Sequence, residues 1–388
     1  MECVAQLRRV RPHVHILCCT ASNTAADVLA TRLLQQLRPN DLLRLYAPSH
    51  GLSKTPKVLH PITCYDEDTD SFAMPDDVAA VPVVICTLVT AARLVDKGLP
   101  RGHFAYILVD EAAQAKEAET VVPLALLDPA AGGRLILGGD PCQLGPVVAS
   151  NVAKEHGLEV SLMERLMRDF PRYRPGAGGA TSGTAFDPAA IVRLVANYRS
   201  HGALLTVPSV LFYGGELLER ANRSETGALV GLPAFSGTDF PFLFHAVEGR
   251  QERQGTNPSW FNADEAAAVL DHVRALRRAG VAAADVVVLS PYRAQIAKVD
   301  ALLGAHGCPG VRVASTEEFQ GGEVTAVVIT TVRSGTVADA PVPGGAVSLG
   351  FLASPKRFNV AITRAKAGMI VVGSPHLAAD EHYAALIA

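Results

Sequence analysis

Residues 105–111 read Ala-Tyr-Ile-Leu-Val-Asp-Glu, an apolar run that ends abruptly in two carboxylates. Similar short apolar runs, each followed by small or polar residues, recur at 14–19, 83–86, 135–137, 286–289, 311–313, 326–329 and 369–372. Continuous apolar strands are buried on both faces, as in parallel sheets covered by helices. The stretches 26–37 and 266–276 between them repeat apolar residues at the spacing of one helix face. The sequence therefore predicts an α/β fold of doubly wound parallel sheets flanked by helices.

The chain is long enough for two to three domains, because it has 388 residues and a domain averages roughly 150. The best candidate boundary is the stretch 172–187, which is rich in Gly, Pro, Ser and Thr and has no apolar period. We therefore predict a first domain over residues 1–185 and a second over residues 186–388.

Composition narrows the class of protein. Hydrophobic residues make up 49% and charged residues 19% of the sequence, which is typical of packed globular proteins. The formal net charge of −3 excludes a basic surface of the histone or ribosomal kind, so nucleic-acid binding would need a local site. The seven cysteines never form C-x-x-C, and no apolar run reaches the roughly 18 to 20 residues of a membrane span. We expect a soluble protein in a reducing, intracellular compartment.

Ligands of open parallel sheets bind beyond the carboxyl ends of the strands, and polar groups gather there in this sequence. Asp110 and Glu111 follow the run 105–109 as in a Walker B motif, where the aspartate holds Mg²⁺ through water and the glutamate activates an attacking water. The plain alternative is an acidic pair that only decorates a helix N-terminus. The string Gly-Asp-Pro-Cys-Gln-Leu-Gly-Pro at 139–146 favours a phosphate site, because Gln143 is placed to sense a γ-phosphate.

Six strings occur in order along the chain and together carry a family resemblance. They are Asp-Glu-Ala-Ala-Gln-Ala (110–115), Gly-Asp-Pro-Cys-Gln-Leu-Gly-Pro (139–146), Asn-Tyr-Arg-Ser-His (197–201), Ser-Pro-Tyr-Arg-Ala-Gln (290–295), Glu-Glu-Phe-Gln-Gly-Gly-Glu (317–323) and Arg-Phe-Asn-Val-Ala-Ile-Thr-Arg-Ala-Lys (357–366). They resemble motifs II to VI of the Upf-type superfamily 1 helicases. With Leu-Gly-Phe-Leu at 349–352, the chain looks most like the Moloney-leukaemia-virus-ten/Armitage branch of RNA helicases. The resemblance implies two RecA-like domains of the P-loop NTPase type.

The resemblance also implies ATP and Mg²⁺ as cofactors and gives roles to the matched residues. Asp110 would coordinate Mg²⁺, Glu111 would activate water, and Gln143 would couple the γ-phosphate to the nucleic-acid site. Arg199 and Arg364 would reach the γ-phosphate, where a guanidinium fork offers fixed donors to phosphoryl oxygens. Outside matched motifs, a surface ion pair would be the simpler account of a single arginine. The other implied nucleotide positions are Tyr198 near the adenine, Glu323 near the ribose, Gln320 and Gly321.

A second set of positions resembles those that touch a single nucleic-acid strand in this family. They are Ser22, Asn23, Thr87, Pro291, Tyr292, Ser315 and Thr316. Hydroxyls and backbone amides at strand ends donate to phosphates without needing net positive charge. This sequence-independent grip fits a motor that translocates on single-stranded RNA. For each serine or threonine taken alone, the alternative role is capping of a turn.

The sequence contains no GxxxxGK[ST] string, whose backbone N–H groups and lysine normally bind the phosphates. The nearest match, 178–184, lacks the lysine and a preceding strand. In the resembled family this loop precedes the motif that residues 21–23 match, so we expect it upstream of Met1. We expect the 388-residue chain alone to have negligible ATPase activity.

The sequence leaves more than one function open. Our first hypothesis is an ATP-dependent RNA helicase core that moves 5′ to 3′, which by resemblance would be a monomeric motor with ribonucleoprotein partners, in the cytoplasm and its ribonucleoprotein granules. A non-catalytic RNA- or protein-binding fragment is the second hypothesis, and a DNA-tracking helicase is the third, since no residue identifies a reader of the 2′-hydroxyl. Trp260, the single tryptophan, is predicted to be a core or staple residue before a helix.

Overall fold

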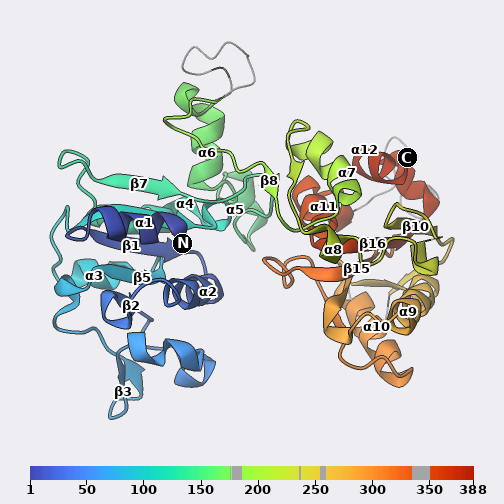
Figure 1. The fold of residues 1–388 in the computed structure, drawn as a ribbon, viewed down its shortest axis with the longest axis horizontal. Helices are drawn as coiled ribbons and strands as arrows, with labels where there is room; N and C mark the ends of the chain where they lie inside the picture. The colour runs from blue at the N-terminus through green and yellow to red at the C-terminus, as the bar shows by residue number, and fades with distance from the viewer. Residues whose placement is uncertain (175, 177–185, 236, 254–258, 334–349) are drawn as a thin grey trace. The chain divides into compact units, whose positions relative to one another are not determined.

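The computed structural model describes residues 1–388 except 175, 177–185, 236, 254–258 and 334–349 (Figure 1). The chain divides into two compact units. Unit 1 comprises Met1–Pro141 and Gly145–Val192, and unit 2 comprises Cys142–Leu144 and Arg193–Ala388. Each unit contains one five-stranded sheet.

The sheet of unit 1 is entirely parallel and has the strand order β2-β5-β1-β6-β7. Its strands are β1 (His15–Thr20), β2 (Leu42–Arg44), β5 (Val83–Thr87), β6 (Phe104–Asp110) and β7 (Arg134–Leu137). Thr20, at the end of β1, is the register partner of both Thr87 and Asp110. The carboxyl ends of three adjacent strands therefore lie level at one edge of the sheet.

Apolar cores cover both faces of this sheet, since consecutive strand residues alternate between two clusters. Ile16 and Cys18 of β1 pack with the helices α1 (Glu2–Val10) and α2 (Asn23–Leu33), whereas Leu17 packs on the opposite side. The shorter helices are α3 (Ala92–Asp96), α4 (Glu117–Thr120), α5 (Asn151–Glu155) and α6 (Leu162–Asp169), and a small antiparallel pair is formed by β3 (Tyr65–Asp66) and β4 (Ser71–Phe72).

The sheet of unit 2 is also parallel, with the order β10-β16-β15-β13-β14. Its strands are β10 (Phe242–Ala246), β13 (Val286–Leu289), β14 (Arg312–Ala314), β15 (Val324–Thr330) and β16 (Ala365–Gly373). Two smaller pairs are β8 (Ala196–Asn197) with β9 (Leu218–Glu219), and the antiparallel β11 (Gln251–Arg253) with β12 (Trp260–Asn262).

Helices cover both faces of the second sheet as well. On one face pack α9 (Ala263–Arg278) and α10 (Arg293–Ala305). The other face is covered by α7 (Gly202–Phe212), α11 (Pro355–Ile362) and α12 (Glu381–Ile387), and the short α8 is Arg223–Thr226. Among the described residues, no helix has the length and apolarity needed to cross a bilayer.

The α/β fold predicted from the sequence is confirmed, because all eight apolar runs form strands of the two parallel sheets. Within the two five-stranded sheets, two strands were missed, and each lies at the edge of its sheet. β2 has only three residues and ends in an arginine, and β10 is only partly buried. Short or half-exposed edge strands do not show the continuous apolar pattern of a central strand.

Candidate functional site

The carboxylate pair lies at the carboxyl edge of the first sheet. Asp110 is the last residue of β6, and the backbone of Glu111 turns away from the strand with a φ of 54°. This left-handed conformation is uncommon for residues with a side chain. Asp110 Oδ1 accepts a hydrogen bond from the Glu111 N–H at 3.1 Å, and Glu111 Oε2 accepts one from Gln114 Nε2 at 2.6 Å. Local hydrogen bonds therefore orient both carboxylates.

The loop that follows β7 packs directly against this turn. The Ala112 N–H donates to the carbonyl of Gly138 at 2.8 Å. A Cβ on Gly139 would lie 2.9 Å from the amide nitrogen of Ala113 and 3.0 Å from that of Ala112. A Cβ on Gly138 would find its nearest neighbour, Asp110 Oδ1, only at 3.6 Å. A glycine at position 139 thus allows the loop 139–146 to pack closely against the turn 110–115.

Three of the predicted RNA-binding residues lie at the same edge of the first sheet. Ser22 caps α2 by accepting the Ala25 N–H at 3.2 Å, and Asn23 is the first helical residue. Thr87 ends β5, and its hydroxyl lies 2.7 Å from that of Thr90. Both hydroxyls also serve local turns, which is the alternative role that the sequence left open.

A buried arginine that sequence reasoning missed holds Asn23. Arg44 ends β2, and its side chain is fully buried. Its Nη2 donates to Asn23 Oδ1 at 2.8 Å, and its Nε donates to Asp27 Oδ1 at 2.8 Å. Tyr46 donates its hydroxyl to the same carboxylate at 2.7 Å, and burial with this hydrogen bond raises the pKa of Tyr46. The predicted RNA-binding end of α2 is therefore anchored to an edge strand.

In unit 2, two basic residues pair with the carboxylate of Glu323. Glu323 accepts a hydrogen bond from Arg199 Nε at 2.7 Å and pairs with Lys366 Nζ at 3.0 Å. Burial alone would raise the pKa of Glu323, but the bonds from Arg199 and Lys366 outweigh it and lower that pKa. The Arg199 and Ser200 N–H groups both donate to Asn197 Oδ1 at 2.9 Å. Two predicted nucleotide-binding residues, Arg199 and Glu323, are thus brought together.

Arg364 is held more tightly, with only 2% of its surface exposed. Its Nε donates to the carbonyl of Val360 at 2.9 Å, and its Nη2 donates to Gln143 Oε1 at 3.3 Å. Gln143 lies in the segment Cys142–Leu144, which belongs to unit 2. Tyr198, by contrast, is 76% exposed. Gln143 and Arg364 therefore lie in contact, as two residues assigned to γ-phosphate chemistry would.

The segment between β14 and β15 carries five of the predicted site residues, namely Glu323 and four that precede it. The Ser315 hydroxyl accepts the Glu318 N–H at 3.1 Å, and the Ser315 N–H donates to the Glu318 carboxylate at 3.1 Å. Thr316 is buried, and so is the amide nitrogen of Gln320. Gly321 has a φ of 77°, which only glycine adopts readily. These bonds order the turn beyond β14.

Pro291 and Tyr292 follow β13, as the sequence indicated. Tyr292 is 5% exposed, so its ring is packed inside the unit. Burial raises the pKa of its hydroxyl, while a hydrogen bond with Arg333 opposes that rise. Pro291 remains partly exposed at the edge of the sheet.

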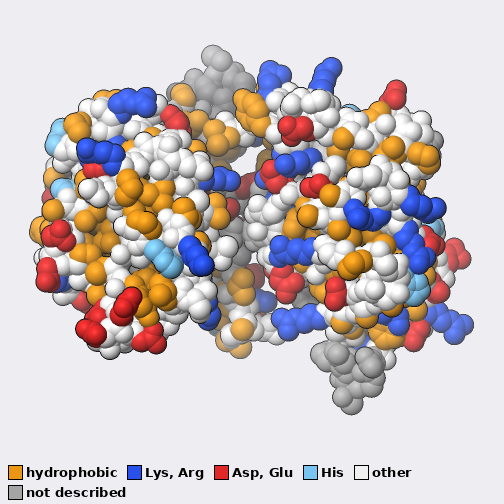
Figure 2. Space-filling model, turned by 60° about the horizontal axis from the view of Figure 1, so that its bottom comes forward, with side chains coloured by type: hydrophobic (Ala, Val, Ile, Leu, Met, Phe, Trp, Pro, Cys, Tyr) orange, Lys and Arg blue, Asp and Glu red, His pale blue; other side chains and the backbone are white. Residues whose placement is uncertain are grey.

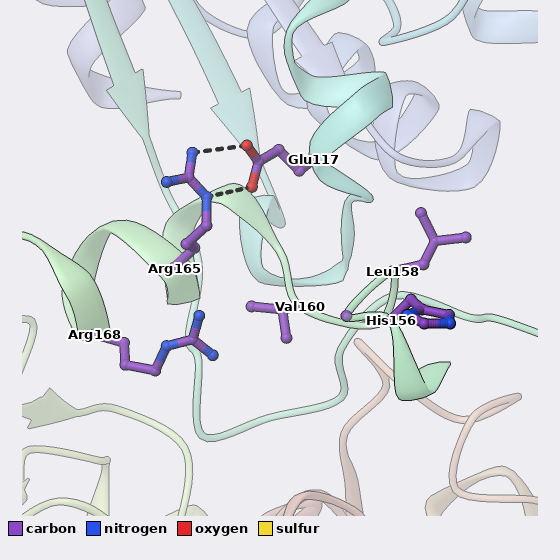
Figure 3. Close-up of a pocket in the computed structure, with 7 residues that line it drawn as sticks. Glu117, His156, Leu158, Val160, Arg165 and Arg168 are labelled. Carbon is purple, nitrogen blue, oxygen red and sulfur yellow. Dashed lines mark hydrogen bonds and ion pairs between the residues drawn. The ribbon is translucent and has the colours of Figure 1, made fainter. Parts of the chain in front are cut away.

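A cavity of about 400 Å³ in unit 1 is lined by residues that the sequence did not predict for the site (Figure 3). Arg165 holds Glu117 there through two hydrogen bonds of 2.6 and 2.7 Å, which lower the pKa of Glu117. His156, Gly157, Leu158, Val160 and Arg168 complete the lining. The charges of Glu117 and Arg165 pair with each other, and Arg168 pairs with Asp169.

Comparisons with known proteins place this geometry in a family. Family models described as an AAA domain match residues 65–151 and 158–376, and the second covers more than half of the chain. RNA helicase Mov10l1 of Homo sapiens is 38% identical over 393 residues, which cover 100% of this chain and 32% of that protein. The protein mov-10-B.1 of Danio rerio is 37% identical over 391 residues, which cover 97% of this chain and 38% of that protein. The chain belongs to the Upf-type superfamily 1 helicases, in their Mov10 branch.

This Mov10-branch chain spans between about a third and two-fifths of those two relatives. Its two α/β units are the RecA-like domains of a helicase core, as the six sequence strings implied. Among solved structures, Arterivirus nonstructural protein 10 (helicase) aligns with 99% of this chain and 58% of that chain, at 13% identity and a TM-score of 0.45.

The carboxylate at the end of β6 fits the metal ion that the sequence implied. Mg²⁺ takes one or two carboxylates together with substrate phosphates and water, and Asp110 supplies one such carboxylate. In the described part of the chain, no group of at least three His, Cys, Asp or Glu residues is placed to hold a metal. Lys366 was not singled out from the sequence, although it stands two residues after Arg364 in a matched string.

Proposed function

We propose that this chain is the core of an ATP-dependent RNA helicase that moves 5′ to 3′ along single-stranded RNA. The observation that carries the proposal is the shared edge of the first sheet. There, Thr20 is the register partner of both Asp110 and Thr87, and only two residues separate the end of β1 from the start of α2. Residues suited to phosphate chemistry and residues suited to binding a strand therefore lie on neighbouring strand ends. A nucleic-acid motor needs such proximity, because it couples nucleotide hydrolysis to movement along the bound strand.

Each carboxylate has a distinct part in the proposed hydrolysis. Asp110, held by the Glu111 N–H, presents oxygen ligands for Mg²⁺, which would neutralise charge on the phosphates. Glu111, oriented by Gln114, would accept a proton from the attacking water. Glu111 lies just beyond the end of β6 on a left-handed turn, so its side chain stands at the edge of the sheet.

The arginines of unit 2 supply the positive charge in this proposal. Arg199 is paired with Glu323, so it exchanges that carboxylate for phosphoryl oxygens when a nucleotide binds. Arg364 is fixed by backbone carbonyls and by Gln143, so its fork is oriented in advance. A guanidinium held in this way stabilises the charge on a transferring phosphoryl group.

The RNA grip in this proposal comes from strand ends and not from a broad basic surface. On the face drawn in Figure 2, the Lys and Arg side chains of unit 2 lie among Asp and Glu side chains. Hydroxyl, amide and backbone N–H groups contact phosphates without reading the bases. Such contacts suit a motor that moves along any sequence. The relative Mov10l1 is named an RNA helicase, which supports RNA over DNA as the track.

The 388 residues contain no GxxxxGK[ST] loop, and we propose that hydrolysis requires a segment that supplies it. The test compares phosphate release by this chain and by a version extended with that loop, each with single-stranded RNA or DNA. We expect RNA-stimulated release from the extended protein only, and we expect Glu111→Gln to abolish it. RNA binding without hydrolysis by the extended protein would instead support a non-catalytic RNA-binding role.

A further inference from the structure

The backbone just beyond β15 makes a strained turn. The Arg333 N–H donates to the carbonyl of Thr331 at 2.8 Å, and the Val332 between them has a φ of 70°. This is the pattern of the γ-turn with positive φ, which is rare and strained. The strain is greater for a β-branched residue such as valine. Such conformations persist only where the surroundings enforce them, and they cluster at functional sites.

Buried polar groups at the start of α9 enforce this turn. Glu265 Oε2 accepts the Val332 N–H at 2.8 Å, and Asn262 Nδ2 donates to the Val332 carbonyl at 3.4 Å. Thr330 donates its hydroxyl to the same oxygen of Glu265 at 2.7 Å. All four residues are buried. The backbone N–H and the backbone carbonyl of Val332 are thus both hydrogen-bonded to side chains from a distant part of the sequence.

The turn directs the next residue toward two aromatic side chains. The Arg333 guanidinium lies 5.0 Å from the centre of the Trp260 ring and hydrogen-bonds with Tyr292. Arg253 stands directly opposite Trp260 in the β11–β12 pair, with its guanidinium 3.9 Å from the same ring. The Trp260 ring therefore contacts two arginine guanidinium groups, which come from two separate segments of the chain.

Packing alone does not account for Trp260. Among the described residues of unit 2, it belongs to neither hydrophobic cluster, and it is only partly buried, so of the two roles expected from the sequence, core or staple, the core role does not hold. The contact with Arg333 places the Trp260 ring near the edge of the sheet. β13 and β15 are neighbours, with Leu289 opposite Ile329, so Tyr292 and Arg333 extend beyond adjacent strand ends. Arg293, which follows Tyr292, is exposed and adds another cation at this edge.

We propose that Arg253 and Trp260 form a binding site for the phosphate backbone of single-stranded RNA, supported from within the unit by Arg333, which is only 8% exposed. The inference rests on the proposed function and extends its track beyond the strand-end hydroxyls. Arginine forks bind phosphate through paired hydrogen bonds, and aromatic rings with arginines recur in proteins that hold single strands. The indole keeps the two guanidinium groups in place, while the clamped turn fixes Arg333 at the strand end.

The test uses Trp260 as its own reporter, because it is the single tryptophan of the chain. The 388-residue chain is titrated with oligouridylate while tryptophan emission is recorded, and the anisotropy of dye-labelled RNA is followed in parallel. We expect both signals to give the same affinity. We expect Arg253→Ala to weaken binding several-fold and to reduce the slope of log K against log salt by about 0.7, the value for one lost phosphate contact on a single strand. Arg333→Ala removes a largely buried support of the ring, so we expect it to weaken binding several-fold with a smaller change in that slope.

Arg278→Ala is the matched control, since it removes one exposed arginine from the last turn of the 16-residue α9. That position is about 24 Å along the helix from the Trp260 end. Arg253 is itself exposed, so its variant keeps the test valid if the Arg333 variant fails to fold. The same reduction is expected with single-stranded DNA, because phosphate is common to both strands. A reduction confined to RNA would contradict backbone recognition.

Two negative results have different meanings. If labelled RNA binds but tryptophan emission stays constant, and both arginine variants bind like Arg278→Ala, the site inferred here is wrong and the proposed function stands. If the unmodified chain binds RNA in neither measurement, the RNA grip of the proposed function itself is wrong.

Discussion

The carboxylate of Glu265 accepts a hydrogen bond from the backbone N–H of Val332 at 2.8 Å, across 67 residues of sequence. The same oxygen accepts the Thr330 hydroxyl. Burial raises the pKa of Glu265 from its usual 4.5 to about 7, although the hydrogen bonds partly oppose that rise. A buried acid thus fixes the end of the strand that leads to Arg333.

This raised pKa predicts how stability depends on pH. Because the folded pKa lies above the unfolded one, the fold binds the proton more tightly, and this favourable term is complete below pH 4.5. It is lost as the pH rises toward about 7 and beyond. The loss amounts to about 3 kcal/mol, at 1.36 kcal/mol per pKa unit. Urea unfolding of the wild-type chain and of Glu265→Gln at pH 5 and pH 8.5 measures it.

We expect Glu265→Gln to gain stability relative to wild type on going from pH 5 to pH 8.5. The control is Asp264→Asn, which neutralises an exposed carboxylate one residue earlier. If the difference between wild type and Glu265→Gln is the same at both pH values, Glu265 does not titrate with a raised pKa. Asp264→Asn should show little change in either condition.

The Glu265 contact also illustrates what sequence reasoning can and cannot reach. Continuous apolar runs predicted the central strands, because burial on both faces leaves a direct trace in composition. A glutamate in the first turn of α9 and an arginine at the end of β2 instead suggest exposed side chains, and their partners become visible only in three dimensions. Val332 gives no local signal for a left-handed turn, because a β-branched residue after a strand normally continues it.

The predicted site residues divide in the same way. Asp110, Glu111 and Thr87 could be placed at one sheet edge because parallel strands bring their carboxyl ends together. The pairing of Glu323 with Lys366 could not be deduced, since it joins a residue just before β15 to a residue of β16, 43 positions further along the chain, and neither residue belongs to an apolar pattern.

A second prediction concerns the two glycines after β7. Gly139→Ala places a methyl group 2.9 Å from the Ala113 amide nitrogen, so the backbone must shift. We expect a loss of about 1 to 3 kcal/mol in the free energy of unfolding. We also expect a sharp fall in ATP hydrolysis by the loop-containing protein, that is, the version extended with the GxxxxGK[ST] loop. Gly138→Ala is the matched control, because its methyl group would have no neighbour closer than 3.6 Å. Equal effects of the two substitutions would contradict the packing described for this loop.

A third prediction concerns the buried pair of Arg44 and Asp27. Removing one member of a buried ion pair leaves the other charge uncompensated and costs about 3 to 5 kcal/mol. We therefore expect Arg44→Met to lower the midpoint of urea unfolding strongly. The exposed pair of Arg38 and Asp41 is the control, and Arg38→Met should leave the midpoint of urea unfolding nearly unchanged. A small effect at Arg44 would mean that the α2 anchor is not energetically important.

A fourth prediction separates catalysis from stability at Arg199. Its pairing with Glu323 is partly exposed, with 29% and 42% of the two side chains accessible. Such a pair contributes little to folding, about 0 to 1 kcal/mol. If Arg199 reaches the phosphates, Arg199→Ala should reduce kcat of the loop-containing protein by about 10³-fold or more while leaving its unfolding curve nearly unchanged. RNA-stimulated phosphate release at saturating ATP measures this effect.

Arg199→Lys distinguishes the guanidinium fork from simple positive charge. A lysine keeps the charge but cannot offer two fixed donors, so we expect it to restore only a small part of the lost kcat. Arg193→Ala is the control, since it breaks the pair of Arg193 with Glu216 in the same unit and should leave kcat unchanged. Full activity of Arg199→Lys would mean that charge alone suffices at this position. A loss of activity that follows a loss of stability would reassign Arg199 to a structural role.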